Sequence, residues 1–444
     1  MSKTTCQKLK IELMWTSALV VDPRNPRKHS DQQIKQIARS IDTFGFNVPI
    51  LIDRNNNVLA GHGRLLACQK LGRREVPAIR LDLTEAEARA FMIADNRLAD
   101  LAAWDERLLA GALNDLSELK LDFSIEATGF TMGEIDLRIE GLSTESQEAD
   151  ERADAIPPPG QQIPLSKTGD LWLLRDHRVY CGTALDARSY ETLMQGMRAA
   201  MVFTDPPYNV PIHGHASGLG AIHHREFAMA SGEMNEAEFV SFLALTCALL
   251  VCHSVDGSIH FVCMDWRQAG NLIVAGKASY SELKNICVWT KHNAGMGSFY
   301  RSQHELIFVF KAGRGAHQNN IQLGQYGRHR SNVWSYPGAN SFSRATDEGH
   351  LLALHPTVKP VRLVADAILD CSTRGDVILD SFLGSGTTLI AAERVGRICH
   401  GIEIDPLYVD TAIRRWQSYT GDGAVHAVTG KRFDDVAVSE VSHG

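Results

Sequence analysis

The sequence predicts a mixed fold in two parts: an amino-terminal α+β module and a larger α/β module built on a mostly parallel sheet with helices on both faces. Three observations predict this division. A chain of 444 residues exceeds what one hydrophobic core usually organises. In the second half of the chain, apolar strands alternate with helices, as they do around parallel sheets. Between the halves, residues 143–160 hold five acidic residues, one arginine and three consecutive prolines, a composition typical of a linker.

These breaks in composition predict the domain boundaries. We expect residues 1–140 to form the amino-terminal domain and residues 141–165 an acidic Pro-rich linker. Residues 166–425 are expected to form the larger domain, followed by a carboxyl-terminal tail over 426–444.

The overall composition restricts the class of protein. Hydrophobic residues make up 44% of the chain and charged residues 22%, which is ordinary for a globular protein. The longest apolar run, Phe239 to Cys252, is shorter than the ~20 residues that cross a bilayer, so we expect no membrane partner. Nine cysteines without a CxxC pair, and a start without an apolar signal region, favour a cytoplasmic protein with no metal site. The net charge of −7 argues against a general nucleic-acid coat, so a nucleic-acid site is expected to be a local patch.

Local signals place helices and a hairpin in the amino-terminal part. Capping-box patterns predict helix starts at Ser30 with Gln33 and at Thr84 with Glu87. Residues 49–53 and 57–60 are expected to pair as a hairpin. A helix over 64–71 should follow the Gly61-His62-Gly63 turn and end at Gly72.

The larger part contains apolar segments of strand length. They lie at residues 200–204, 258–263, 285–289, 304–310, 376–380 and 398–404. The apolar run from Phe239 to Cys252 is expected to be a core helix between the first two strands. Ligands of such sheets bind beyond the carboxyl ends of strands, so the residues just after 200–204, 376–380 and 398–404 are candidates for a site.

A glycine-rich turn follows the strand that ends at Asp380. Gly384 and Gly386 allow close backbone approach, and Glu403 ends the next strand 19 residues after Gly384. This interval is typical of an acidic residue that binds a ribose hydroxyl, and it predicts an adenosyl cofactor. The alternative is that the two glycines only form a structural turn between a strand and a helix, which would account for the glycines but not for Glu403. Leu389 replaces the third glycine of the dinucleotide pattern, which favours S-adenosyl-L-methionine over a dinucleotide.

A second motif, Thr204-Asp205-Pro206-Pro207-Tyr208, follows the 200–204 strand. Two prolines remove two backbone donors and leave carbonyl oxygens free to accept hydrogen bonds. The set suits a planar base with an exocyclic amine: Tyr208 would stack on the ring, while Asp205 and the Pro206 carbonyl accept the two N–H bonds. Each residue alone is common in a turn, but the ordered tetrapeptide at this place favours a base site.

These motifs resemble those of the DNA amino-methyltransferases that modify adenine N6 or cytosine N4. DPPY at 205–208, HPTVKP at 355–360 and FLGSGT at 382–387 occur in the order of the beta class, in which the catalytic motif comes first. The resemblance covers roughly residues 168–420. It implies a Rossmann-like, S-adenosylmethionine-dependent methyltransferase domain. DPPY resembles adenine-specific members more than the SPPY usual in cytosine-specific ones, so we expect adenine N6, with cytosine N4 as the alternative.

The resemblance also implies roles for individual residues. For the target base and its amine it implies Asp205, Pro206, Pro207 and Tyr208. For the methionine end of the cofactor it implies Phe382, Gly384, Ser385, Gly386 and Thr387, with Asp380 nearby. For the ribose it implies Glu403, and for the carboxylate region Thr357 and Lys359.

The segment between the two motifs, residues 291–345, is expected to recognise double-stranded DNA. It holds seven Lys and Arg residues against one acid, Glu305. Aromatic residues expected to supply stacking surfaces are interleaved with them, among them Phe299, Tyr300, Trp334 and Tyr336. A solvated basic face would explain the charges alone. The family carries target recognition in this place, which favours a DNA site. The candidate DNA-binding residues are Arg301, Arg328, Arg330, Asn332 and Arg344.

The amino-terminal module resembles the ParB/sulfiredoxin-like domains, through Asn25 to Arg27 and the GHGRLLACQKLG run at 61–72. A Gly-x-x-Arg turn at a helix start contacts phosphates in ParB-type CTPases, and Gly61 and Arg64 match its spacing. His62 and Gly63 stand where those CTPases usually carry Glu and Arg, so nucleotide hydrolysis is not expected. A nucleotide, DNA and a protein partner stay open as ligands of this module.

Together these observations predict site-specific methyl transfer from S-adenosyl-L-methionine to adenine in DNA. The alternative from another class is a ParB-like DNA-binding regulator with an inactive methyltransferase domain. An NAD-linked enzyme is a third hypothesis, which the missing glycine and DPPY disfavour. The sequence does not specify the oligomeric state, for which a homodimer is one hypothesis.

Overall fold

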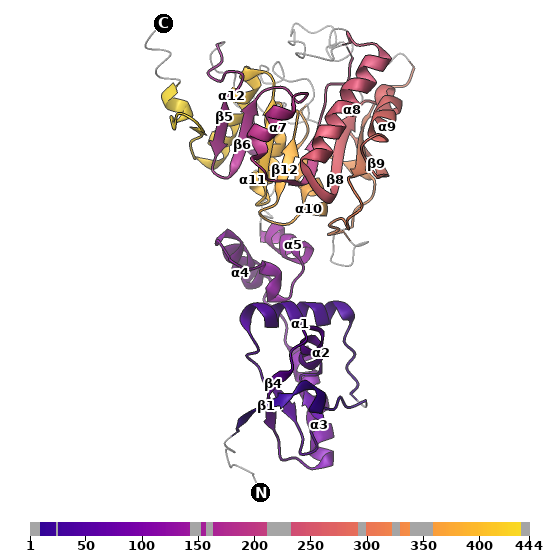
Figure 1. Cartoon of the computed structure of the whole chain (residues 1–444), viewed down its shortest axis with the longest axis vertical. Helices are drawn as coiled ribbons and strands as arrows, with labels where there is room; N and C mark the ends of the chain where they lie inside the picture. Colours follow the sequence, from indigo (N-terminus) through magenta and orange to yellow (C-terminus); the bar gives the residue numbers. More distant parts are fainter. Residues whose placement is uncertain are drawn as a thin grey trace. The chain divides into compact units, whose positions relative to one another are not determined.

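The computed structural model describes residues 9–23, 25–142, 152–156, 163–210, 232–291, 299–321, 329–337 and 358–436. The chain divides into two compact units, Met1–Leu142 and Ser143–Gly444 (Figure 1). Each unit has its own sheet and its own hydrophobic core. In the described part of the chain, no helix is long and apolar enough to span a membrane.

A four-stranded mixed sheet forms the centre of the first unit, in the order β1, β4, β2, β3. The strands are β1 (Ile11–Trp15), β2 (Ile50–Ile52), β3 (Val58–Ala60) and β4 (Glu75–Arg80). β2 and β3 pair antiparallel, which confirms the predicted hairpin, and β2 runs parallel to β4. Ile50, Ile52 and Val58 are fully buried in the core of this unit.

Helices and 3₁₀ turns complete the first unit: η1 (Thr16–Ala18), α1 (Asp31–Phe44), α2 (His62–Lys70), α3 (Glu85–Leu101), α4 (Glu106–Glu118), η2 (Ile125–Thr128) and α5 (Met132–Leu142). Ser30 and Thr84 cap α1 and α3 as predicted, because each side chain accepts a backbone N–H from the third residue of its helix. α2 begins at His62, two residues before the predicted start, after Gly61 in a left-handed conformation.

The sequence analysis did not predict the α4–α5 pair. These helices enclose a small core of Leu113, Ile125, Met132 and Ile135 with the 3₁₀ turn η2. A capping box was nevertheless visible at the start of α5. The Thr131 N–H donates to Glu134 Oε2 over 2.8 Å, and the Glu134 N–H donates to Thr131 Oγ1 over 3.4 Å.

The second unit is built on a ten-stranded sheet in the order β11, β9, β10, β8, β7, β12, β13, β6, β5, β14. Its strands are β5 (Leu171–Leu174), β6 (His177–Cys181), β7 (Ala199–Thr204), β8 (Ser254–Met264), β9 (Glu282–Thr290), β10 (His304–Lys311), β11 (Val333–Ser335), β12 (Val377–Asp380), β13 (Ile398–Glu403) and β14 (Val425–His426). The five central strands, from β8 to β6, are parallel, as predicted. β10 and β9 on one side, and β5 and β14 on the other, pair antiparallel and extend the sheet beyond that prediction.

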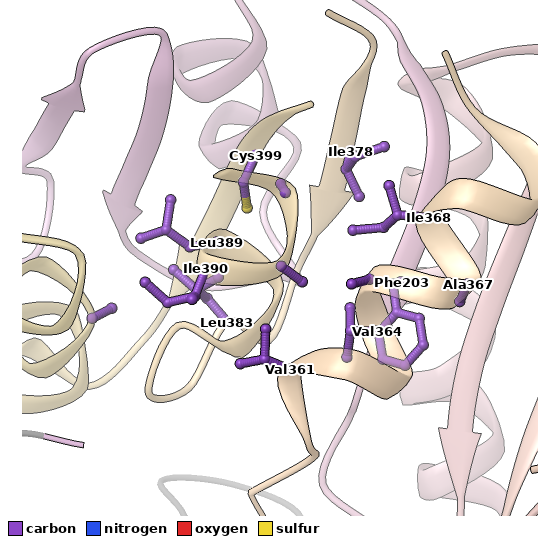
Figure 2. Packing of buried hydrophobic residues seen from close by; sticks show 14 of the residues in the cluster. Phe203, Val361, Val364, Ala367, Ile368, Ile378, Leu383, Leu389, Ile390 and Cys399 are labelled. Atoms are coloured by element: carbon purple, nitrogen blue, oxygen red, sulfur yellow. The ribbon is translucent and has the colours of Figure 1, made fainter. Parts of the chain in front are cut away.

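Helices lie on both faces of this sheet, as predicted (Figure 1). They are α7 (Ala187–Met194), α8 (Glu236–Cys252), α9 (Ala269–Gly276), α10 (Val361–Cys371), α11 (Thr387–Arg394) and α12 (Pro406–Thr420). α10, α11 and α12 share one core cluster, whereas α8 and α9 contribute to another. Figure 2 shows Phe203 of β7, Ile378 of β12 and Val364 and Ile368 of α10 gathered in the first cluster. This apolar contact holds β7 and β12 together, and both candidate motifs follow these two strands.

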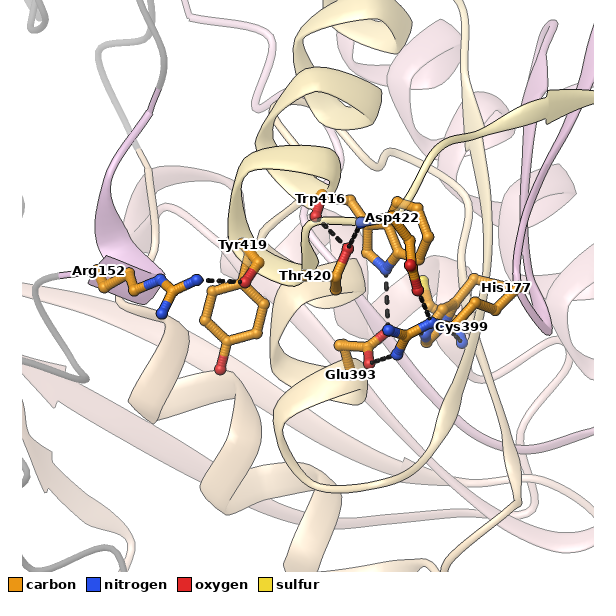
Figure 3. Close-up of polar contacts among 9 residues, drawn as sticks. Arg152, His177, Glu393, Cys399, Trp416, Tyr419, Thr420 and Asp422 are labelled. Atoms are coloured by element: carbon orange, nitrogen blue, oxygen red, sulfur yellow. Dashed lines mark hydrogen bonds and ion pairs between the residues drawn. The ribbon is translucent and has the colours of Figure 1, made fainter. Parts of the chain in front are cut away.

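Glu393 on α11 joins three elements of the second unit through polar contacts (Figure 3). Its Oε2 accepts from His177 Nε2 of β6 over 2.8 Å and from Trp416 Nε1 of α12 over 2.9 Å. Arg175 donates to its Oε1 over 2.8 Å. Burial alone would raise the pKa of Glu393, but the His177 and Trp416 hydrogen bonds lower it below its usual value. This network fixes α11, whose amino end carries the glycine-rich turn.

Part of the predicted acidic linker packs on the second unit. Ala153 is buried in the main core cluster. The backbone N–H groups of Leu165 and Ser166 donate to the Asp410 carboxylate of α12 over 2.7 and 3.0 Å. Most of the acidic residues of the linker lie outside the described residues.

Candidate active site

The two candidate motifs meet at the point where the strand order reverses. From β7 the chain continues to β8 on one side of the sheet, whereas from β12 it continues to β13 on the other. β7 and β12 are neighbours, so the residues after Thr204 and after Asp380 leave the sheet side by side. Thr204 Oγ1 donates to Asp380 Oδ1 over 2.9 Å and joins the two strand ends directly. Open α/β sheets bind their ligands at such a reversal.

The Asp205–Tyr208 turn presents a half-buried carboxylate beside a half-buried aromatic ring. The Tyr208 hydroxyl donates to Asp205 Oδ1 over 2.5 Å, and its ring packs against both large core clusters. Burial raises the pKa of Tyr208 well above its usual value, so the phenol remains a hydrogen-bond donor at neutral pH. Pro206 is buried and Pro207 half-buried, which holds the turn rigid.

Asn209 anchors the chain immediately after this turn. Its Oδ1 accepts from the backbone N–H groups of Gly232 and Met234 over 3.0 and 3.2 Å, and its Nδ2 donates to the Met234 carbonyl over 2.7 Å. One side chain therefore ties residue 209 to residues 232–234. The sequence analysis did not single out Asn209, because its partners lie more than twenty positions away.

A buried ionic cluster lies behind the Asp205 carboxylate. Lys359 Nζ contacts Asp205 Oδ2 over 2.5 Å and Glu305 Oε2 of β10 over 3.0 Å. Lys291, just beyond β9, forms an ion pair with the other oxygen of Glu305. Burial alone would raise the pKa of Glu305, but Lys359 and Lys291 lower it to about 2. Burial alone would lower the pKa of Lys359, but Asp205 and Glu305 raise it well above its usual value.

The glycine-rich turn after β12 is fixed by Asp380. Its Oδ1 accepts from Thr204 Oγ1 and from the Phe382 N–H over 3.0 Å, and its Oδ2 accepts from Thr388 Oγ1 over 2.7 Å. Burial raises the pKa of Asp380 to about 6. Asp380, predicted to lie near the cofactor, therefore braces the turn through three contacts within the protein.

Glu403 closes the other side of the same turn. Its Oε2 accepts the Gly384 N–H and its Oε1 accepts the Asp405 N–H, each over 2.8 Å. The side chain is buried, and burial raises the pKa of Glu403 to about 7. Because each carboxylate oxygen has two lone pairs, both oxygens can still accept a hydrogen bond from a hydroxyl group.

Arg415 of α12 supports the turn from within the core. Its Nη1 donates to the Ser385 carbonyl and to Thr387 Oγ1, each over 3.3 Å, and its Nη2 donates to the Ala153 carbonyl over 2.9 Å. Burial lowers the pKa of Arg415 to about 10. The sequence analysis missed this residue, because an arginine within an amphipathic helix carries no local signal for a buried role.

The residues around the glycine-rich turn fit an adenosyl group. A rigid glycine turn, an acidic residue at the end of the next strand with acceptor capacity left, and the half-buried Phe382 ring adjoin the Asp205–Tyr208 turn. A ribose offers two hydroxyl donors, and an adenine offers a flat apolar face. Of the residues predicted for this group, Phe382 and Gly384 to Thr387 lie in one turn, which Glu403 at the end of β13 contacts through the Gly384 N–H. Thr357 lies outside the described residues.

Comparison with known proteins shows the family. A family model described as DNA methylase, of the N6/N4 type, matches residues 199–414, from β7 to α12. The ParB N-terminal domain model matches residues 2–97, and the ParB-methyltransferase HTH domain model matches residues 107–168. The chain therefore contains a DNA methylase domain of the N6/N4 type, preceded by a ParB N-terminal domain. The predicted family and fusion are thereby confirmed, and the matched HTH segment covers the helical pair α4–α5 except for Glu106.

Curated relatives agree with both halves of this methylase. It is 26% identical over 263 residues to the type II methyltransferase M2.MboI of Moraxella bovis, covering 55% of this chain and 89% of that protein. It is 36% identical over 98 residues to M.ScaI of Streptomyces caespitosus, of which it spans 32%. At the amino end it is 40% identical over 75 residues to the ParB-like nuclease domain-containing protein YnaK of Escherichia coli, covering 86% of that protein.

Solved structures match parts of the chain at low overall similarity. PvuII DNA methyltransferase (cytosine-N4-specific) matches with 15% identity and a TM-score of 0.40, over 57% of this chain and 88% of that one. Caulobacter crescentus ParB complexed with CTP-gamma-S matches with 19% identity and a TM-score of 0.26, over 33% of this chain and 93% of that one.

The residues predicted to bind DNA differ in their exposure to solvent. Arg301 and Asn332 of the methylase are exposed. Arg330 is largely buried: its Nε contacts Asp370 over 3.0 Å and its Nη1 contacts the Tyr336 hydroxyl over 2.7 Å. Its positive charge is therefore balanced within the protein. Arg328 and Arg344 lie outside the described residues.

Two aromatic residues of this segment have structural positions. Trp334 and Tyr336, expected to supply stacking surfaces, are 4% and 7% exposed and belong to the main core cluster. That expectation was wrong for these two residues, because β11 pairs with β9 and turns both rings inward. Phe299 and Tyr300 are 85% and 82% exposed and keep the expected surface position.

In the ParB domain, the Gly61 turn is closed by the side chain of Arg64. Arg64 Nη1 donates to the Val48 carbonyl over 2.7 Å, and its guanidinium lies over Gly61, where an added Cβ would be 3.0 Å from a guanidinium nitrogen. His62 is buried, and burial lowers its pKa. The predicted Gly-x-x-Arg turn therefore forms, with Arg64 packed against it.

Proposed function

We propose that this methylase transfers a methyl group from S-adenosyl-L-methionine to N6 of adenine within a specific sequence of double-stranded DNA. The observation that carries the proposal is the junction of the two motifs: the Asp205–Tyr208 turn and the Phe382–Thr387 turn leave adjacent parallel strands, and the Thr204–Asp380 hydrogen bond links the ends of these strands. When bound, S-adenosyl-L-methionine supplies an electrophilic methyl group.

The target base must leave the duplex to reach this turn, at a cost of about a few kcal/mol. In the proposed complex its ring stacks on Tyr208, and its exocyclic amine donates to Asp205 and to the Pro206 carbonyl. Asp205 Oδ1 and Oδ2 already accept from Tyr208 and Lys359, but each keeps a second lone pair for the amine. The carboxylate then stabilises the positive charge that develops on the amine nitrogen.

The residues around Glu403 are proposed to hold the cofactor. Glu403 would accept the ribose hydroxyls, Phe382 would pack on the adenine ring, and Gly384, Ser385, Gly386 and Thr387 would line the methionine end. Held in this way beside Asp205, the two reactants are oriented for direct transfer, which needs no covalent intermediate with the protein.

Sequence recognition is proposed to involve the exposed residues Arg301 and Asn332, with the HTH segment at 107–168 as a further DNA contact. For the ParB domain, a nucleotide, DNA and a protein remain the candidate partners, and Caulobacter crescentus ParB has been crystallised with CTP-gamma-S.

The decisive experiment incubates the protein with DNA and labelled S-adenosyl-L-methionine and identifies the modified nucleoside by mass spectrometry. N6-methyladenine supports the proposal, N4-methylcytosine would replace it with the alternative specificity, and no transfer would favour a DNA-binding regulator. Asp205→Ala should lower kcat by about 10²-fold or more while the Kd of the cofactor stays unchanged. Asp176→Ala, at an exposed turn, is the matched control.

A further inference from the structure

Lys359 lies deep in the protein, although lysine is rarely buried. Its side chain is 3% exposed and its ammonium contacts three groups from two distant segments. These are Asp205 Oδ2 over 2.5 Å, Glu305 Oε2 over 3.0 Å and the Tyr208 hydroxyl over 3.2 Å. A burial of this kind is stable only when the ammonium is fully paired and hydrogen-bonded.

We propose that Lys359 is a positioning residue for the methyl-transfer reaction: its ammonium holds the Asp205 carboxylate in place, Glu305 holds the ammonium, and Lys291 pairs with the other oxygen of Glu305. The inference rests on the proposed function of Asp205 and adds residues that the motif does not contain. It gives Lys359 a role toward the target base, whereas the family resemblance implied a contact with the cofactor carboxylate.

The charges of the cluster balance. Two carboxylates, Asp205 and Glu305, alternate with two ammonium groups, Lys359 and Lys291, so that each carboxylate faces at least one cation. Lys359 is the only described cation in ion-pair contact with Asp205. Without it, two carboxylates would adjoin the Tyr208 hydroxyl, which lies 2.5 Å from Asp205 Oδ1 and 3.4 Å from Glu305 Oε2. Neighbouring carboxylates disfavour each other's ionisation.

The other titratable groups around the cluster cannot replace Lys359. They are the Tyr208 phenol, the Cys263 thiol of β8 and the Asp380 carboxyl of β12. Burial raises the pKa of Cys263 well above its usual value, and none of the three carries a positive charge. The rings of Tyr208 and Trp289 lie 5.7 and 5.9 Å from the Lys359 ammonium and form cation–π contacts with it. These contacts also favour a positive charge at this position.

Lys359 also determines which lone pairs of Asp205 remain for a substrate. Its ammonium occupies one site on Oδ2, and the Tyr208 hydroxyl occupies one site on Oδ1. The carboxylate is thus held from both oxygens, and its plane cannot rotate without breaking one of these hydrogen bonds. A fixed acceptor for the target amine is what alignment with a methyl donor requires.

The test compares Lys359→Gln, Lys359→Arg and the double variant Lys359→Gln/Glu305→Gln, with Lys277→Gln as the same substitution at an exposed position. For Lys359→Gln, the acid limb of kcat against pH should move up by about one pH unit or more, because two carboxylates share the site. On that limb kcat then falls about tenfold. Lys359→Arg should recover part of the loss, and the double variant should return the acid limb toward that of the wild type.

The Kd of S-adenosyl-L-methionine separates this role from cofactor binding. We expect it to stay within about twofold in every variant, because the contacts of Lys359 are to Asp205, Glu305 and Tyr208. A tenfold weaker Kd with an unchanged pH profile at saturating cofactor would overturn the proposal and restore the cofactor role. A merely structural role would lower the yield of folded protein without moving the acid limb.

A second measurement does not depend on activity. Between about pH 5 and pH 8, the unfolding free energy of Lys359→Gln should fall relative to the wild type as the carboxylates lose their protons, and the double variant should remove that fall. If the wild type methylates no DNA, the proposed function fails while this measurement still reports on the cluster. An unfolding free energy of Lys359→Gln that is parallel to the wild type across this range would overturn the inference.

Discussion

Gly386 is expected to be required by two separable physical effects, a backbone conformation and a close helix contact. It precedes α11 with φ 86°, a left-handed conformation that costs a residue with a Cβ about 1–2 kcal/mol. A Cβ placed on Gly386 would also lie 2.9 Å from Cβ of Ala412 on α12, far inside normal contact. Overpacking of this kind costs about 1–3 kcal/mol. Gly386→Ala should therefore destabilise the methylase unit by about 2–5 kcal/mol.

A matched glycine isolates the first effect. Gly421 ends α12 with φ 81°, and nothing lies within 4 Å of a Cβ added there. Gly421→Ala should cost only the conformational part, about 1–2 kcal/mol. The double variant Gly386→Ala/Ala412→Gly removes the opposing Cβ, so its destabilisation should be smaller than the sum of the two single effects.

The assay is urea unfolding followed by tryptophan fluorescence. Trp172, Trp289 and Trp416 are fully buried in the second unit, so the signal reports on the unit that contains the mutation. The same variants should bind S-adenosyl-L-methionine more weakly when Gly386 is changed but not when Gly421 is changed. Equal destabilisation by Gly386→Ala and Gly421→Ala would refute the reasoning, because the contact with Ala412 would then have no measurable effect.

Three further substitutions test the other parts of the site. Burial raises the pKa of Glu403 to about 7, so its contribution to stability is complete below its usual pKa of 4.5 and is lost as the pH rises through about 7. Between about pH 4.5 and pH 7, the unfolding free energy of the wild type should fall by up to about 3 kcal/mol relative to that of Glu403→Gln. A difference between the two proteins that stays constant over this range would refute the raised pKa of Glu403. Arg330→Gln should cost about 3 kcal/mol of stability, because the buried Asp370 loses its ion pair with Arg330, and it should leave the salt dependence of DNA binding unchanged. Arg301→Gln should instead reduce the slope of log Kd against log salt by about one, and equal slopes for the two variants would contradict the assignment.

The local signals of the chain predicted much of the fold. The capping patterns at Ser30 and Thr84 fixed the starts of α1 and α3, and the six apolar segments of the larger part all formed strands. The short strands toward the two edges of the sheet were less visible. β11, β14 and β5 are only three, two and four residues long, too short for an alternating pattern to show.

The basic segment shows the limit of counting charges. Seven cations against one acid indicated a DNA surface, yet Lys291 and Arg330 are paired with Glu305, Asp366 and Asp370. Two of these carboxylates come from α10, outside the segment in which the charges were counted. Charge balance is a property of neighbours in space, so a sum along the chain overestimated the positive charge available for phosphates.

The amino-acid sequence was sufficient to predict the class of chemistry. The tetrapeptide after one strand and the glycine turn after another are each contiguous in the sequence, so each can be recognised without knowledge of the tertiary structure. The tertiary structure alone decided what surrounds them. Lys359 reaches Asp205 from 154 positions away, and Glu305 reaches Tyr208 from 97 positions away. These contacts depend on which strands are neighbours in the folded sheet, and the free energy that selects that order comes from burying the whole core rather than from any one segment.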